Sequence, residues 1–109
     1  MRNQIDPAIL PEHLLRALIS LCQRYRVRDL ALFGSAAGEG FNPETSDIDI
    51  LVDFEPMPST EHMQHYFGFL EALEELFQRR VDLVERTSIR NPYVLASILK
   101  SRVDLYAAA

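Results

Sequence analysis

Residues 32–54, LFGSAAGEGFNPETSDIDILVDF, place two aspartates at the start of a segment that otherwise has the pattern of a buried strand. Alternation along this strand puts four apolar side chains on one face: Ile48, Ile50, Val52 and Phe54. The other face carries Asp47, Asp49, Leu51 and Asp53. Because an isolated carboxylate is costly to remove from water, this second face must border a compensating charge or another polar partner.

The segments around this strand alternate between helix and strand patterns. Residues 11–27 and 61–79 repeat apolar side chains at helical spacing, and residues 29–34 and 80–85 read as short strands. Residues 91–106 predict a short helix followed by a brief strand. The predicted buried stripes of the two long helices are Leu14, Leu18, Leu21, Cys22 and Tyr25 in the first, and Phe67, Leu70, Leu73 and Phe77 in the second. This order indicates an α/β fold with a small sheet flanked by helices.

Length and composition narrow the class of protein. The chain of 109 residues has room for one domain, which we assign to residues 1–106, leaving out Ala107–Ala109 as a cloning scar. A net charge of −5 argues against binding of long nucleic acid, and no apolar run is long enough to span a membrane. Cys22 is the only cysteine, so an internal disulfide is excluded and a core role is expected for it. These features favour a cytoplasmic protein.

The aspartates have the spacing of a metal site. Asp47 and Asp49 lie on one side of their strand, roughly 6–7 Å apart, and Asp82 can join them if its strand is the neighbour. Three carboxylates this close repel one another unless a cation is present, and oxygen ligands of this kind suit Mg²⁺. Two such ions can clamp the attacking and leaving oxygens of a displacement at phosphorus.

A glycine and a serine supply the second half of such a site. Gly34 ends the first strand and lets the backbone approach a ligand closely, while Ser35 is placed to open a helical turn. The unpaired N–H groups at a helix start bind phosphate. Taken alone, a Gly-Ser pair is usually a turn and an N-cap, and an Asp-x-Asp at a strand start is usually solvated. The combination predicts a site for a small phosphorylated ligand.

Other polar residues suggest weaker sites. His62 and His65 are three apart on a predicted helix, but with no third ligand in view we expect a solvated helix face. His13 is expected on the surface of the first helix. For Asp53 we expect structural or electrostatic support rather than metal ligation, because it lies further along its strand.

With these residues in view, the chain resembles the minimal nucleotidyltransferases, a small branch of the DNA polymerase β superfamily. The resemblance runs from about Leu30 to Tyr106 and rests on FGS, SDIDILVDF, VDLV and NPYVLASILKSRVDLY. It implies a polymerase-β-type fold with a mixed sheet, and catalysis with two Mg²⁺ and ATP. The implied roles are metal binding and catalysis for Asp47, Asp49 and Asp82, and nucleotide binding for Gly34 and Ser35.

The resemblance also implies a partner. Family members of this size act as antitoxins of HEPN-domain ribonuclease toxins and transfer AMP from ATP to a tyrosine of the toxin. Two departures leave an alternative open: eleven residues separate Ser35 from Asp47 where ten are usual, and Gly38 stands where the family commonly has an Arg. Arg79, Arg80 or Arg86 could replace that charge. The alternative is a catalytically weakened member that neutralises its toxin by direct binding, and homo-oligomerisation also stays open.

Overall fold

The computed structural model describes residues 10–34 and 47–108. In these parts of the chain, three α-helices and a short 3₁₀ turn accompany four strands. In chain order they are α1 (Glu12–Arg24), β1 (Val27–Phe33), β2 (Ile48–Phe54), α2 (Ser59–Phe77), β3 (Val81–Glu85), η2 (Arg86–Ser88), α3 (Pro92–Ser101) and β4 (Val103–Ala107). The predicted α/β fold is therefore confirmed.

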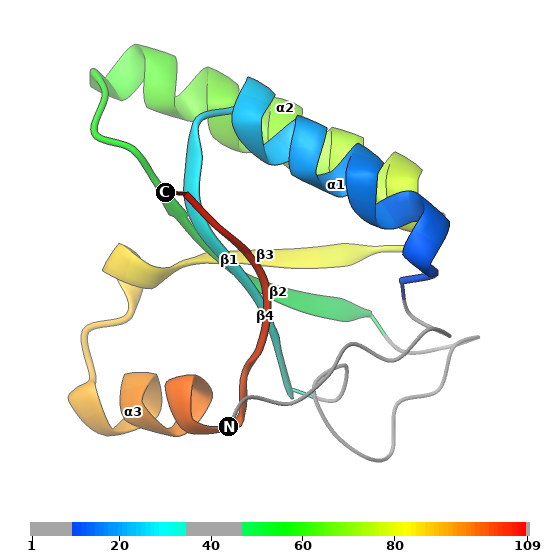
Figure 1. Ribbon diagram of the computed structural model, residues 1–109. Helices are drawn as coiled ribbons and strands as arrows, with labels where there is room; N and C mark the ends of the chain where they lie inside the picture. The colour runs from blue at the N-terminus through cyan, green and yellow to red at the C-terminus, as the bar shows by residue number, and fades with distance from the viewer. Residues whose placement is uncertain (1–9, 35–46, 109) are drawn as a thin grey trace.

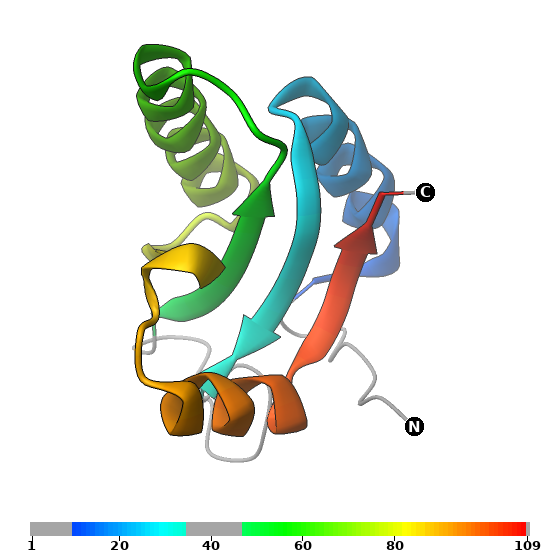
Figure 2. The same cartoon turned by 90° about the vertical axis from the view of Figure 1, so that its left-hand side faces the viewer.

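The four strands form one sheet in the order β3-β2-β1-β4. β1 runs antiparallel to both β2 and β4, whereas β2 and β3 are parallel, so the sheet is mixed. A parallel pair needs a crossover connection, and α2 provides it. Figure 1 shows α1 and α2 side by side on one face of the sheet, with α3 on the other face. Figure 2 shows α3 lying across one end of the strands.

The hydrophobic core lies between the sheet and the pair α1 and α2. The apolar face of β2 is buried there, as its alternation predicted, and the α1 stripe packs into the same core around Leu18 and Cys22. Tyr25, at the end of α1, packs its ring on Phe69 of α2, with 5.7 Å between ring centroids. The opposite face of β2, with Asp49 and Asp53, stays partly exposed.

The boundary between α1 and β1 differs from the prediction. The helix pattern extended to Val27, but α1 ends at Arg24 and Val27 is the first, fully buried residue of β1. Arg26 turns the chain with a positive φ of 58°. This left-handed conformation is usually marked by a glycine, and because none is present here the break has no local sequence signal.

The prediction of which α2 side chains are buried was wrong at one position. Phe67 is 59% exposed, while Phe69, Leu73 and Phe77 are buried and Leu70 packs at the margin of the core. At the C-terminus, β4 extends one residue past the predicted Tyr106, because Ala107 pairs with Asp29 of β1. No helix within the described residues has the length and apolarity needed to cross a membrane.

Two phenylalanines two residues apart on α2 test this placement of the core. Phe69→Ala empties a fully buried site and should lower the free energy of unfolding by about 3–5 kcal/mol. Phe67→Ala removes an exposed ring and should change it by no more than about 0.5 kcal/mol. Urea denaturation of both variants measures the difference, and equal losses would contradict the assigned core face.

Candidate functional site

The parallel pairing of β2 and β3 brings together two of the three predicted carboxylates. Asp49 is the direct partner of Asp82 in this register, on the sheet face away from α1 and α2. Asp47 is exposed and immediately precedes β2. Neighbouring strands lie about 4.8 Å apart, so the register alone places the Asp49 and Asp82 side chains next to each other.

Asp49 shows the electrostatic cost of this arrangement. Its pKa is raised, first by burial and then by the negative charges of Asp82 and Asp47, and it also shares a side-chain hydrogen bond with Asp82. Hydrogen bonding between two carboxyl groups requires a shared proton, which a bound cation can replace. Asp49 therefore experiences the charges of both other carboxylates, and shared metal binding by all three stays a prediction.

Gly34 lies directly against this carboxyl group. It has a positive φ of 64°, and a Cβ built on it would come 3.3 Å from Cγ of Asp49 and closer still to Oδ2. Any side chain at residue 34 would therefore push into Asp49, besides being strained by the backbone conformation. The glycine of the predicted phosphate turn and the central aspartate of the predicted metal site thus lie in contact. Ser35 lies outside the described residues.

The donor set fits a hard divalent cation that keeps other ligands. In the described parts of the chain, no group of three or more His, Cys, Asp or Glu side chains is arranged to hold a metal ion by itself. Mg²⁺ is usually bound by only one or two carboxylates, with water and substrate phosphates completing its shell. Asp49 and Asp82, with Asp47 beside them, match that requirement better than they match a closed protein cage.

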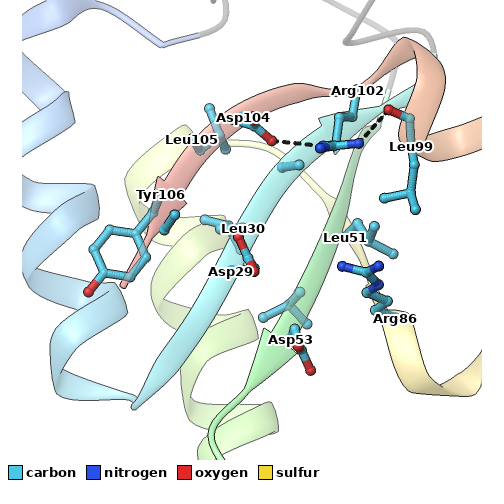
Figure 3. A pocket seen from close by; sticks show the side chains of 13 residues that line it. Asp29, Leu30, Leu51, Asp53, Arg86, Leu99, Arg102, Asp104, Leu105 and Tyr106 are labelled. Carbon is cyan, nitrogen blue, oxygen red and sulfur yellow. Dashed lines mark hydrogen bonds and ion pairs between the residues drawn. The ribbon is translucent and has the colours of Figure 1, made fainter. Parts of the chain in front are cut away.

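A cavity of about 470 Å³ lies further along the same face of the sheet. Its floor includes Leu51, two residues beyond Asp49 on β2, and α3 contributes Leu99. Figure 3 shows Arg102 bonded to both Asp104 and the Leu99 carbonyl, and Arg86 entering beside Leu51. The sequence pattern missed this cavity, because its shape depends on how α3 packs against the strands.

The secondary candidates also have definite places. Asp53 accepts hydrogen bonds from Arg28, at 2.7 and 3.1 Å, which agrees with the supporting role expected for it. His62 and His65 lie on a partly rather than fully solvated face, where both make contacts. His62 is hydrogen-bonded to Glu85 of β3, and His65 bonds the Glu61 carbonyl oxygen at 2.8 Å and packs edge-on against Tyr25.

Comparison with solved structures supports the same fold. A structure described as a provisional minimal nucleotidyltransferase is similar with a TM-score of 0.70 and 31% identity, over 84% of this chain and 88% of that one. A complex described as a tri-AMPylated Shewanella oneidensis HEPN toxin with its MNT antitoxin is similar with a TM-score of 0.57. It covers 89% of this chain and 72% of that one at 19% identity, a likeness of fold alone.

Sequence relatives lead to the same family. A Methanocaldococcus jannaschii protein named provisionally as protein adenylyltransferase MJ1379 is 44% identical over 80 residues, covering 72% of this chain and 76% of the relative. Protein adenylyltransferase MntA of Thermococcus cleftensis is 42% identical over 71 residues, covering 65% and 68%. The sequence model described as "Nucleotidyltransferase domain" matches residues 15–105, which include every predicted site residue. The chain therefore belongs to the nucleotidyltransferase domain family.

Proposed function

We propose that this nucleotidyltransferase is a cytoplasmic antitoxin that transfers AMP from ATP to a tyrosine of a HEPN-type ribonuclease toxin. The observation that carries the proposal is the contact of Gly34 with Asp49, which is itself paired with Asp82. Relatives named as protein adenylyltransferases support the reaction, and the fold shared with an antitoxin in complex with an AMPylated HEPN toxin supports the partner.

The sheet order suggests where each substrate lies. Gly34 follows β1 and Asp82 is on β3, so the two flank β2 with Asp49 between them. The triphosphate tail would lie on the β1 side, at Gly34 and Ser35. An in-line displacement needs the nucleophile opposite the leaving group, so the acceptor hydroxyl would approach from the β3 side, past Asp82.

Asp47, Asp49 and Asp82 would hold two Mg²⁺ in this site. When bound, these ions supply charge neutralisation at the α-phosphate and favour the deprotonated acceptor. In the reaction the tyrosine oxygen forms a bond to the α-phosphorus, and the bond from that phosphorus to the pyrophosphate oxygen breaks. Pyrophosphate leaves, and the hydroxyl proton passes to solvent. This chain's part is to position the reactants and stabilise their charge.

A second candidate is supported by Gly38, which lacks the charge of the Arg common in the family. In that case the protein would neutralise its toxin by contact alone.

Combined Asp47→Asn and Asp49→Asn substitutions separate the two candidates. With the toxin encoded beside it, ATP and Mg²⁺, the unchanged protein should add AMP to the toxin, and the double variant should do so at least about a hundredfold more slowly. Intact-mass analysis of the toxin measures the product. Asp53→Asn is the matched control, since Asp53 is on the same strand but pairs with Arg28. Full inhibition of the toxin by the double variant without ATP would favour the contact mechanism.

The raised pKa of Asp49 also leads to a prediction about the stability of the fold. Its pKa is raised in the folded protein, so folding favours its protonated form and stability is lost as the pH rises through that pKa. Without Mg²⁺ at neutral pH, Asp49→Asn should therefore raise the melting temperature by a few degrees. The gain should shrink as the pH falls through that raised pKa, because the carboxyl group of the wild-type protein then becomes protonated.

Thermal melts with and without Mg²⁺ measure this effect. Mg²⁺ should stabilise the unchanged protein more than Asp49→Asn, because the variant has lost a ligand. A destabilised Asp49→Asn variant at neutral pH without metal would contradict the assigned crowding of carboxylates.

A further inference from the structure

One stripe of α2 side chains bonds to β3 at alternate residues. His62 is hydrogen-bonded to the Glu85 carboxylate, and the Tyr66 hydroxyl donates to the Leu83 carbonyl oxygen at 2.5 Å. Glu74 accepts a hydrogen bond from the Val81 N–H at 3.1 Å. Residues 62 and 66 lie one above the other on the helix, and residue 74 lies about two turns further along, where the helix has turned by about 80°.

Two of these bonds satisfy backbone groups at the open edge of the sheet. Among the described strands, β3 lies at the edge and pairs with β2 alone. Ile48 N–H bonds the Arg80 carbonyl, so in a parallel ladder the backbone groups of alternate residues 80, 82 and 84 face β2. Those of Val81 and Leu83 face outward, where the Glu74 carboxylate and the Tyr66 hydroxyl reach them.

The two backbone hydrogen bonds lie on either side of Asp82 in β3. Asp82 lies between Val81 and Leu83, and its side chain is exposed while theirs are buried towards α2. Tyr66 and Glu74 therefore hold the β3 backbone on both sides of Asp82 without touching the expected metal position. The buried side chains of Val81 and Leu83 hold β3 against α2, and these two bonds add restraint on its backbone at the open edge.

We propose that Tyr66 and Glu74 are positioning residues that set the Asp82 carboxylate against Asp49 for metal binding. This inference rests on the proposed function, because it assigns the metal site to those two aspartates. Electrostatics agree with the placement: the pKa of Tyr66 is raised by burial and then by the charges of Glu85 and Asp82, so the hydroxyl stays protonated and able to donate. The ring of Tyr66 packs at the margin of the core, so removing only the hydroxyl leaves the packing in place.

Tyr66→Phe tests the inference through the dependence on Mg²⁺. The Mg²⁺ concentration at half saturation should increase about tenfold, measured both from the rate of AMP transfer and from the rise in melting temperature. This is the lower end of the effect on metal affinity expected for residues that orient a metal ligand. High Mg²⁺ should restore most of the rate. A variant that merely lost folded protein would be slower at every Mg²⁺ concentration, with an unchanged midpoint.

Tyr25→Phe is the matched control, since Tyr25 packs against α2 from the end of α1. Its Mg²⁺ midpoint should equal that of the unchanged protein. Glu74 provides a second test: Glu74→Gln keeps an oxygen that can accept from Val81 and should retain the midpoint, whereas Glu74→Ala should shift it in the same direction as Tyr66→Phe.

The outcomes distinguish this inference from the proposed function. An unchanged protein that responds to Mg²⁺ in neither assay contradicts the proposed function and, with it, the metal-positioning role. If the unchanged protein responds and Tyr66→Phe and Glu74→Ala keep its midpoint, only the positioning role is overturned. Equal shifts in Tyr25→Phe and Tyr66→Phe would likewise overturn it, since the effect would then be general loosening around α2.

Discussion

The parallel register between β2 and β3 is the constraint on which the acidic site depends. It sets Asp49 opposite Asp82, although each residue alone would look like an ordinary polar position on a partly exposed strand. A slip of one residue would turn the Asp82 side chain to the core face of the sheet, where a charge has no partner. The register is therefore supported from both faces, by the burial of Val81 and Leu83 beneath α2 and by the exposure of Asp82 on the other side.

The two faces of the sheet have different roles. On one side, α1 and α2 bury the apolar alternation of the strands and supply stability. On the other, the same strands present Asp49 and Asp82, and further along a cavity closed by α3 and Arg102. Gly34 would join the two halves of the proposed site, because its missing side chain is the space that the Asp49 carboxyl group occupies. The fold thus tolerates a crowded group of negative charges that contributes nothing to the hydrophobic core.

Much of this could be predicted from the sequence, because strand alternation and glycine placement are local signals. The alternation of β2 identified its core face, and the spacing of Asp47 and Asp49 indicated a shared side. Whether Asp82 would join them depended on which strand lies beside β2, which no local pattern states. The aromatic-rich segment around Phe67 and Phe69 offers two helical stripes of similar quality, and only the angle at which α2 packs selects the buried one.

The crossover between β2 and β3 has a consequence for how the protein is made. Asp49 is synthesised well before Asp82, and the whole of α2 lies between the two strands along the chain. Contacts so distant along the chain form late and slowly compared with helices. During translation, a growing chain that has passed β2 but not β3 therefore carries its first aspartates without their neighbour. Cation-binding ability should emerge only after β3 and its Asp82 have been synthesised, so termination before β3 would yield fragments that are inert as well as unstable.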